Sequence, residues 1–370
     1  MKVALHVDQL RAAAPGGIGT YVRELATALA AQDDVPDLVR FTSRWDGPAP
    51  AELGEVVEVP ATIRTLYPRW ALTRRPPLPE ALRACDVVHA TNHAAVPPAA
   101  EGQGLVVTVH DLAFDRFPHA FPAAWRWLYR AALRAAIRRA DVLLVPSRAT
   151  HDDLRAHGAP EERIRVTPLA ASLPAGDADV DGVLTRLGIE RPYVLSPGTI
   201  EPRKNQVRLI RAYRQVAPDV PHALVLAGPD GWGVDEVDAE IARPGPGTIV
   251  RTGALTPADL DAVYRGADVA AYVSLYEGFG LPVVEAMRRG VAVLGSTTLA
   301  VAETAGDAAL LVDPEDVAEI ADGLARLLSE PGVRGELVEK GRIHADGFTW
   351  GTTARATLEA YREAKDRARA

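Results

Sequence analysis

The stretch that decides the fold is Tyr272–Met287, which reads YVSLYEGFGLPVVEAM. It begins as an apolar run typical of a strand, turns at Gly278 and Gly280, and continues as a helical pattern behind Pro282. Proline suits the first turn of a helix, where its missing N–H is not needed. A strand, a glycine turn and a helix start place free backbone N–H groups at the carboxyl edge of a sheet, where anions bind.

Two glutamates accompany this turn. Glu277 lies within it, and Glu285 lies about one turn into the predicted helix. Each carboxylate can accept several hydrogen bonds, so the pair suits a hydroxyl-rich ligand beside an anion site. The alternative is an ordinary strand–helix turn with two solvated glutamates.

The segment E-G-F-G-L-P-V-V-E resembles the E-x7-E signature of the retaining GT-B-fold glycosyltransferases of the GT4 family, the group 1 glycosyltransferases. The resemblance covers nearly the whole chain, is strongest over 192–314 and is weak over 35–90. It implies an α/β fold of two Rossmann-like, doubly wound domains that face a central cleft. We expect an N-terminal acceptor-binding domain at 1–170 with a returning helix at 350–370, and a nucleotide-sugar-binding domain at 171–349.

The composition agrees with two domains of ordinary size. The chain has 370 residues, 48% hydrophobic and 24% charged, which is normal for a globular protein. A net charge of −8 argues against a nucleic-acid partner, which would favour a strong positive excess. A single cysteine, Cys85, fits a reducing cytoplasm. The start, MKVALHV, predicts a strand instead of a signal peptide.

Strand and helix patterns alternate in both halves, which predicts parallel sheets covered on both faces. Residues Pro60–Pro79 are rich in proline and arginine and predict an irregular loop region. The tail Phe348–Tyr361 predicts a helix, and in the GT-B fold the last helix crosses back onto the first domain.

A glycine-rich segment, PGGIGTY at Pro15–Tyr21, precedes a helical pattern. Gly16 and Gly17 have no side chains, so a bulky group can approach their backbone N–H groups closely. A diphosphate could therefore bind there. A tight turn with a helix cap is the alternative.

A basic segment, PGTIEPRKN at Pro197–Asn205, follows a predicted strand and resembles the family's G-x-x-x-x-R-K-N pattern. The planar fork of Arg203 and the compact charge of Lys204 suit two linked phosphates. A basic turn is the alternative, but the pair lies where a parallel sheet binds anions.

The segment GLVVTVHD, Gly104–Asp111, places His110 and Asp111 where a strand should end. Retaining GT4 enzymes have a histidine at this position that faces the donor sugar, so the resemblance assigns His110 to the sugar hydroxyls and the reaction centre. The alternative is a histidine satisfied by backbone at a strand end. Asp111 could position His110 or accept a hydrogen bond from the acceptor hydroxyl.

Residues Pro122–Ala140 predict a helix with apolar contacts from Trp127, Leu128, Leu133 and Ile137. Arginine recurs every fourth residue along it. We interpret this stripe as a solvated face; a weak peripheral contact with an anionic membrane, as in relatives with lipid acceptors, is the alternative. The stripe consists of Arg126, Arg130, Arg134 and Arg138.

The resemblance also implies the site residues. No metal and no cofactor is expected, because the Asp-x-Asp at Asp177–Asp179 lies in the predicted linker Ala170–Asp181 and not at a strand end. The nucleobase is expected near Leu255, the ribose at Glu285, and the sugar hydroxyls at Glu277. The catalytic residues are then His110, Glu277, Arg203 and Lys204, and the donor-binding residues are Gly16, Gly17, Arg203, Lys204, Leu255, Glu277, Gly278, Phe279, Gly280, Leu281 and Glu285.

These features predict a cytoplasmic, retaining, metal-independent hexosyltransferase. It would move a hexose from a nucleoside-diphosphate sugar to a hydroxyl of a glycan, a lipid-linked sugar or a small natural product. The segments T-V-H-D-L-A-F and E-G-F-G-L-P resemble those of mannosyltransferase-type relatives, which favours mannose and GDP-mannose as the donor. Glucose, N-acetylglucosamine and a UDP-linked donor are the alternatives. The alternatives are a GT-B-fold sugar-nucleotide epimerase and a non-catalytic sugar-nucleotide-binding subunit. The acceptor, the linkage and the oligomeric state do not follow from the sequence.

Overall fold

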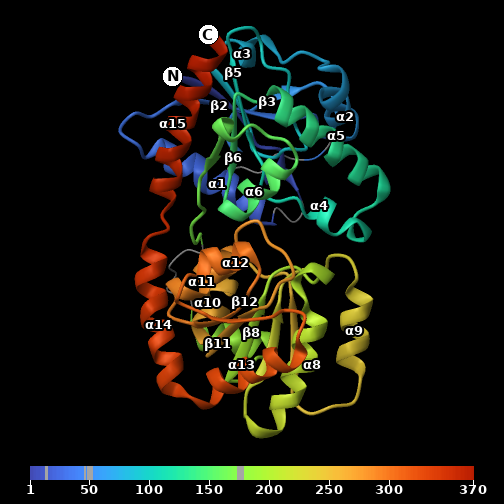
Figure 1. Cartoon of the computed structure of the whole chain (residues 1–370), viewed down its shortest axis with the longest axis vertical. Coiled ribbons are helices and arrows are strands. Elements are labelled where there is room, and N and C mark those ends of the chain that lie inside the picture. Colours follow the sequence, from blue (N-terminus) through green and yellow to red (C-terminus); the bar gives the residue numbers. More distant parts are fainter. Residues whose placement is uncertain (13–15, 46, 48–52, 173–178) are drawn as a thin grey trace. The chain divides into compact units, whose positions relative to one another are not determined.

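The computed structural model describes residues 1–12, 16–45, 47, 53–172 and 179–370 (Figure 1). The chain divides into two compact units. Unit 1 consists of Met1–Leu169 and Thr349–Ala370, and unit 2 consists of Ala170–Phe348. Part of the predicted linker, residues 173–178, lies outside the described residues.

Unit 1 is built on a parallel sheet. Its described residues form seven strands in the order β3-β2-β1-β4-β5-β6-β7, and the central strands β4, β5 and β6 are buried along their whole length. Such continuous apolar strands are typical of a sheet with helices on both faces. The strands are β1 (Lys2–His6), β2 (Asp37–Ser43), β3 (Val57–Val59), β4 (Val87–Ala90), β5 (Gly104–Thr108), β6 (Val142–Val145) and β7 (Ile164–Val166).

The helices of unit 1 pack in two groups. Helix α2 packs on α5, and α1 packs on α15, which also runs along β4, β5 and β6. The helices are α1 (Gly16–Ala30), α2 (Ile63–Thr73), α3 (Glu80–Arg83), α4 (Ala113–Arg116), α5 (Ala123–Arg139), α6 (Arg148–Ala156) and α15 (Trp350–Arg369), with 3₁₀ turns η1 (Asp8–Arg11), η3 (Pro118–Ala120) and η4 (Glu161–Arg163).

The prediction of an irregular loop over Pro60–Pro79 was wrong, because helix α2 forms there. Proline inside a helix costs about 3 kcal/mol through a lost backbone hydrogen bond, so Pro68 suggested a break. Leu66, Tyr67 and Trp70 recur at helical spacing and are all buried. Burial of each such side chain contributes about 1.5–3 kcal/mol, which outweighs the cost of the proline.

Unit 2 repeats the architecture. Its described residues form a six-stranded parallel sheet in the order β10-β9-β8-β11-β12-β13. The strands are β8 (Tyr193–Pro197), β9 (Ala223–Ala227), β10 (Ile249–Gly253), β11 (Val269–Tyr272), β12 (Ala292–Ser296) and β13 (Leu310–Val312). The helices are α7 (Val180–Leu187), α8 (Gln206–Val216), α9 (Val234–Ala242), α10 (Pro257–Gly266), α11 (Leu281–Arg288), α12 (Leu299–Ala305), α13 (Val317–Ser329) and α14 (Pro331–Asp346), with 3₁₀ turns η5 (Pro202–Lys204) and η6 (Ala217–Asp219).

The last helix, α15, belongs to unit 1 although the chain reaches it from unit 2. Its buried face includes Ala354, Leu358 and Tyr361. The helix approaches the start of β5 so closely that a Cβ at Gly104 would lie 2.7 Å from the backbone carbonyl carbon of Ala364. Glycine is therefore required there for the helix to lie on the sheet.

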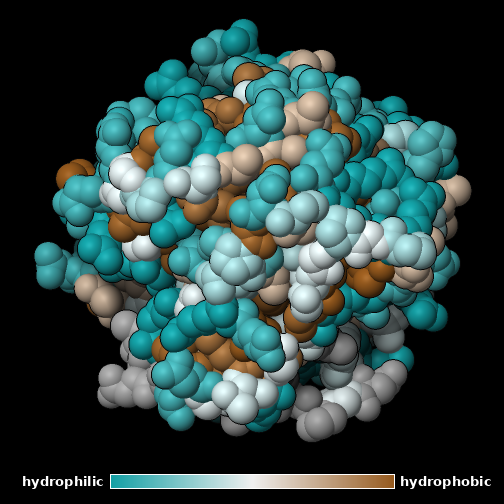
Figure 2. Space-filling model, turned by 90° about the horizontal axis from the view of Figure 1, so that it is seen from below, coloured by the Kyte–Doolittle hydropathy of each residue, from teal (hydrophilic) through white to brown (hydrophobic). Residues whose placement is uncertain are grey.

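The face seen in Figure 2 is mostly hydrophilic, and its hydrophobic side chains form separate patches. Over the ranges that the structure describes, the helices are too short or too polar to cross a membrane.

Candidate active site

The turn quoted at the outset lies at the carboxyl edge of the unit 2 sheet. Strand β11 ends at Tyr272, and helix α11 begins at Leu281. Gly280 caps the helix with φ +103°, a conformation that favours glycine. The hydroxyl of Thr304 donates to the carbonyl of Phe279 at 2.6 Å, which fixes the turn from the α12 side.

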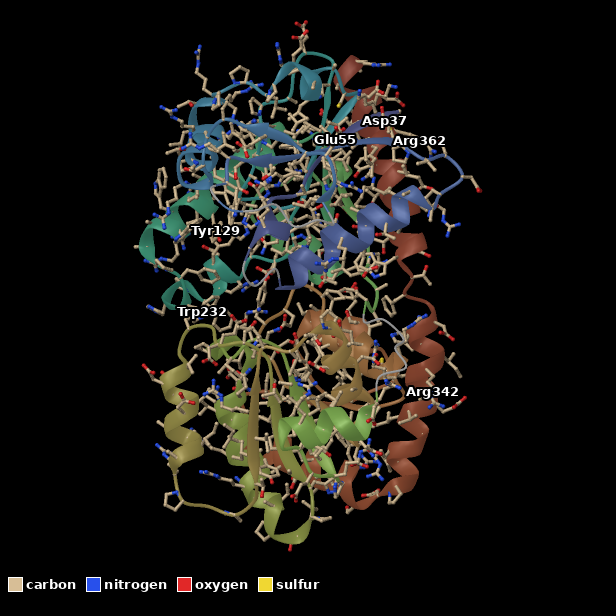
Figure 3. The ribbon with its side chains drawn as sticks, turned by 180° about the vertical axis from the view of Figure 1, so that it is seen from behind. Asp37, Glu55, Tyr129, Trp232, Arg342 and Arg362 are labelled. Atoms are coloured by element: carbon tan, nitrogen blue, oxygen red, sulfur yellow. The ribbon has the colours of Figure 1, made fainter. Side chains whose placement is uncertain are left out.

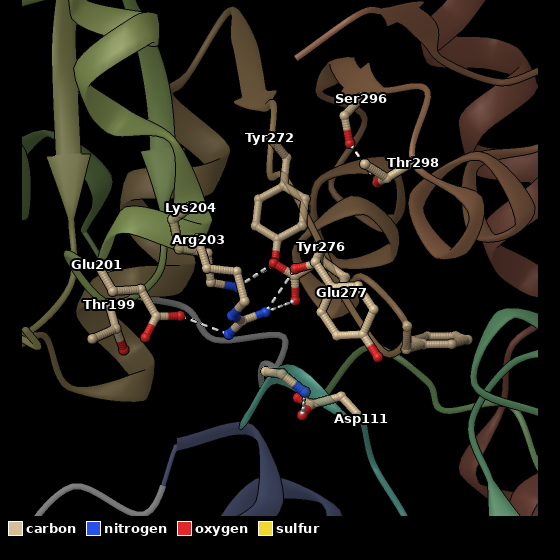
Figure 4. Close-up of polar contacts among 12 residues, drawn as sticks. Asp111, Thr199, Glu201, Arg203, Lys204, Tyr272, Tyr276, Glu277, Ser296 and Thr298 are labelled. Atoms are coloured by element: carbon tan, nitrogen blue, oxygen red, sulfur yellow. Dashed lines mark hydrogen bonds and ion pairs between the residues drawn. The ribbon is translucent and has the colours of Figure 1, made fainter. Parts of the chain in front are cut away.

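Arg203 and Lys204 lie in η5, directly after β8, and their side chains converge on Glu277 (Figure 4). Arg203 Nη1 donates to Glu277 Oε2 at 2.6 Å, and Lys204 Nζ donates to Glu277 Oε1 at 2.7 Å. The main chains are also joined, since Leu275 N–H donates to the Arg203 carbonyl at 2.8 Å. Two turns that are distant in the sequence therefore form one rigid cluster.

Two residues without a predicted role complete this cluster. Arg203 Nη2 donates to Glu201 Oε1 at 2.6 Å, and Lys204 Nζ donates to the Tyr272 hydroxyl. The sequence held a signal for both: Glu201 precedes Arg203 by two residues, and Tyr272 ends a strand at the ligand-binding edge. We name the cluster of Glu201, Arg203, Lys204, Tyr272 and Glu277 the charge cluster.

Electrostatics keep Glu277 ionised within the charge cluster. Burial alone would raise the pKa of Glu277, but the charges of Arg203 and Lys204, with hydrogen bonds from Lys204 and Tyr272, lower it to about 2. Burial lowers the pKa of Lys204, and the charge of Glu277 opposes this shift. Glu277 thus accepts bonds from Arg203, Lys204 and Tyr272, and a carboxylate with about four lone-pair sites keeps room for one further donor. The sequence predicted that Glu277 binds sugar hydroxyls. In the structure Glu277 also holds the side chains of Arg203 and Lys204 in place.

Glu285 lies on α11, and its Oε2 accepts a hydrogen bond of 2.9 Å from the Tyr264 hydroxyl of α10. Burial raises the pKa of Glu285, although the hydrogen bond from Tyr264 and the charge of Arg289 oppose the rise. The sequence did not point to Tyr264, because no local sequence pattern shows that a residue of one helix will contact a residue of the next helix. The second carboxylate oxygen, Oε1, does not take part in this contact and is the one that a ligand could use.

The remaining unit 2 residues of the predicted site lie in loops at carboxyl ends of strands. Leu255 is half-buried after β10. Gly278, Phe279, Gly280 and Leu281 form the turn after β11. The loop after β9 carries Trp232, which is 39% exposed (Figure 3). All these loops meet at one edge because the sheet is parallel.

In unit 1, His110 lies two residues beyond β5 and is held on two sides. Its Nε2 lies 2.9 Å from the Thr91 carbonyl oxygen, and its ring meets the ring of Tyr21 edge to face, with centroids 4.8 Å apart. Burial lowers the pKa of His110, so the neutral ring is favoured. A carbonyl can only accept, so Nε2 carries the proton and Nδ1 is left as a hydrogen-bond acceptor.

Gly16 and Gly17 are exposed at the first turn of α1, and Gly16 has φ +59°. Pro15, which opens the predicted cradle, lies outside the described residues. Asp111 Oδ1 accepts from the N–H of Ala113, the first residue of the short helix α4, at 2.9 Å. The structure thus gives Asp111 a local partner other than His110.

The arginine stripe on α5 is largely paired with protein groups or exposed. Arg126 Nη1 donates to the Pro118 carbonyl at 3.0 Å, and Arg130 Nη2 donates to Asp115 at 2.7 Å. Arg134 and Arg138 are exposed. Trp127 was expected to make apolar contacts but is 54% exposed. The aromatic contacts come instead from Tyr129 (Figure 3), whose ring packs against Phe114, Phe121, Trp125 and His93.

Comparison with known proteins decides the family. A model of the group 1 glycosyl transferases matches residues 186–344, and a model of glycosyltransferase family 4 matches residues 15–173. The O-antigen chain mannosyltransferase B of Escherichia coli is 32% identical over 266 residues, which is 70% of this chain and 70% of that protein. The chain belongs to the group 1 glycosyltransferases. The resemblance stated from the E-x7-E segment is confirmed.

A further relative and two solved structures are also similar to this chain. The MMP alpha-(1->4)-mannosyltransferase of Mycolicibacterium hassiacum is 28% identical to this chain. The alignment covers 94% of this chain and 95% of that protein. Sucrose-phosphate synthase from Thermosynechococcus elongatus superposes with a TM-score of 0.77 at 23% identity, covering 98% of each chain. Anabaena Alr3699/HepE, solved in complex with UDP and glucose, gives a TM-score of 0.74 at 19% identity, over 97% of this chain and 98% of that one. The GT-B fold is confirmed.

The charge cluster predicts a pH-dependent loss of stability in Glu277→Gln. The folded-state pKa of Glu277, about 2, lies below its ordinary value of 4.5. Ionisation of Glu277 therefore stabilises the fold fully above about pH 4.5, and this stabilisation is lost as the pH falls through about 2. We expect Glu277→Gln to lower the free energy of unfolding by roughly 3 kcal/mol at pH 7, measured by urea denaturation.

The difference in free energy of unfolding between Glu277→Gln and the unchanged protein should stay constant from about pH 8 to about pH 5.5. It should become smaller below about pH 4.5. Glu339→Gln, which changes an exposed glutamate of α14, is the matched control and should have little effect. Equal stability of Glu277→Gln and the unchanged protein at pH 7 would contradict the account.

Proposed function

We propose that this glycosyltransferase moves a hexose, with mannose favoured, from a nucleoside-diphosphate sugar to a hydroxyl of its acceptor, with retention and without a metal ion. The observation that carries the proposal is the buried charge cluster beside the start of α11. Two mannosyltransferases among the relatives support mannose, and the neighbour solved with UDP and glucose supports a nucleotide-sugar donor. A glycan, a lipid-linked sugar and a small natural product all offer a suitable acceptor hydroxyl.

Unit 2 would bind the leaving group. A nucleoside diphosphate leaves with growing negative charge, and fixed donors lower the barrier most when they need no reorganisation. Arg203 and Lys204 are such donors because Glu277 orients both. The amides from Phe279 to Leu281 lie beside them at the start of α11, where the positive end of the helix dipole adds to the field.

The two glutamates would bind the rings on either side of the diphosphate. Glu285 can accept from the ribose hydroxyls through Oε1, while Tyr264 holds Oε2. Glu277 can accept from a sugar hydroxyl through a remaining lone pair. The nucleobase is then assigned to the loop at Leu255, after β10.

Unit 1 would supply contacts to the sugar and the diphosphate. His110 presents Nδ1 as an acceptor for a hydroxyl of the donor sugar, because Thr91 holds its Nε2–H. Gly16 and Gly17 present first-turn amides of α1 to the diphosphate.

Two single substitutions test the charge cluster. Arg203→Ala and Lys204→Ala should each lower kcat/KM for GDP-mannose roughly 100-fold, by analogy with the loss of one oxyanion donor. Arg186→Ala is the control: this arginine is 58% exposed and pairs with Asp259 at 2.5 Å on the surface of unit 2, so its loss should change kcat/KM by less than about twofold. Near-normal activity in both cluster variants would remove the site assignment.

Retention is proposed because the resemblance to retaining GT4 enzymes implies it. A double displacement is not proposed, because no pair of carboxylates is assigned as nucleophile and acid. The acceptor would attack on the face of the sugar from which the diphosphate leaves, and a departing phosphate oxygen would take the acceptor proton. With GDP-α-mannose as donor, NMR of the product should show an α linkage. A β linkage would overturn this part of the proposal.

Metal independence is proposed because Arg203 and Lys204 can meet the charge of the diphosphate. Of the Asp-x-Asp pair, Asp177 lies outside the described residues, and Asp179 caps α7 by accepting from Gly182 N–H at 3.1 Å. Turnover should be undiminished in EDTA. Complete loss of turnover, restored by Mn²⁺, would refute the expectation.

A further inference from the structure

A line of buried polar side chains crosses unit 1 from helix α15 to the neighbourhood of His110. The Tyr361 hydroxyl lies 2.7 Å from His89 Nδ1, and His89 Nε2 lies 2.8 Å from Thr108 Oγ1. Thr108 Oγ1 lies 3.0 Å from the Tyr21 hydroxyl. The Tyr21 ring then contacts the ring of His110. We name Tyr361, His89, Thr108 and Tyr21 the buried relay.

The buried relay is unusual for the core of a parallel sheet. Tyr361 and His89 are completely buried, and Tyr21 and Thr108 are at most 2% exposed. Their neighbours on the strands are valine, leucine and alanine. Buried polar groups cost free energy unless every member finds a partner, and a satisfied network fixes the positions of its members more strictly than apolar packing does.

The relay is uncharged, so its hydrogen bonds are directional. Burial lowers the pKa of His89 to about 3 and raises the pKa of the Tyr21 and Tyr361 hydroxyls. A neutral imidazole has one donor and one acceptor nitrogen. His89 therefore donates to one neighbour and accepts from the other, which sets the orientation of each group in turn.

The relay ties together four elements of unit 1, since His89 lies on β4 and its other three members lie on three further elements. Thr108 lies on β5, two residues before His110; Tyr21 lies on α1; and Tyr361 lies on α15. The hydrogen bond between Thr108 and Tyr21 fixes the Tyr21 ring, which contacts the ring of His110. On its other side, His110 is held by the carbonyl of Thr91, whose hydroxyl donates to the His6 carbonyl at 2.8 Å.

We propose that Tyr361, His89, Thr108 and Tyr21 are positioning residues for His110. Helix α15, which carries Tyr361, then contributes to the activity of the protein. The inference rests on the proposed function, in which His110 contacts the donor sugar. The relay touches no reacting atom; it fixes the ring orientation in which Nδ1 is presented to a sugar hydroxyl. Small errors in such an orientation cost turnover even when the substrate still binds.

The substitution that tests the relay is Thr108→Val, with Thr108→Ser as its matched control. Valine has the shape of threonine and suits a strand, but it removes the hydroxyl that both His89 and Tyr21 need. Serine keeps that hydroxyl. We expect Thr108→Val to lower kcat with GDP-mannose about tenfold and Thr108→Ser to stay within about twofold of the unchanged protein.

A double-mutant cycle separates positioning of His110 from a general loss of structure. Thr108→Val should cost little further turnover in a His110→Ala background, because the residue being positioned is already gone. Tyr361→Phe, which removes one hydroxyl at the far end of the relay, should follow the same pattern if Thr108→Val fails to fold. Tyr213→Phe removes a buried hydroxyl bonded to the His222 carbonyl at 2.8 Å in unit 2 and should not couple to His110.

A second readout needs no turnover. The ¹H–¹⁵N spectrum of the histidine rings should show the His110 signals at the same positions in the unchanged protein and in Thr108→Ser, and at displaced positions in Thr108→Val, because Thr108 no longer holds the Tyr21 ring that contacts His110. An unchanged His110 signal in Thr108→Val, or an equal loss of turnover with and without His110, overturns the positioning inference alone. Full activity of His110→Ala would instead overturn the role of His110 in the proposed function.

Discussion

The interaction on which the site depends is the buried carboxylate of Glu277 between Arg203 and Lys204. Two desolvated cations side by side would repel each other and resist burial, and an unpaired buried charge is strongly destabilising. Glu277 and Glu201 supply matching negative charge, so the charge cluster is neutral overall and stable without a ligand. Its N–H donors are thereby fixed in place before any diphosphate arrives, which is the condition for electrostatic stabilisation without reorganisation.

The parts of this site that the sequence predicted are contiguous in the chain. The strand–glycine–helix stretch around Glu277 and the Arg203–Lys204 pair each form one local element, so their spacing is visible without knowledge of the fold. The alternation of strands and helices likewise predicted two parallel sheets. Tyr264 and Tyr272 were missed as partners because their roles arise only where separate elements pack together. Helix α2 was missed for the opposite reason: Pro68 gave a strong local signal that tertiary burial overrode.

In unit 1, too, contacts between residues far apart in the sequence could not be predicted from local patterns. The contact of His89 with Tyr361 joins positions separated by 272 residues, and the close approach of α15 to β5 depends on the absence of a side chain at Gly104. Neither is a motif, yet together they place helix α15 against β5, the strand that ends two residues before His110. The two units thus use one strategy: buried, mutually satisfied polar groups hold the few side chains that are offered to a ligand.

The most direct test of the account is a crystal structure of the protein with GDP bound. The account predicts diphosphate oxygens within hydrogen-bond distance of Arg203 and Lys204, with the Glu277 carboxylate still bridging the two cations and Glu285 at the ribose. A diphosphate bound elsewhere on the protein, or a Glu277 carboxylate that has left both cations, would contradict it.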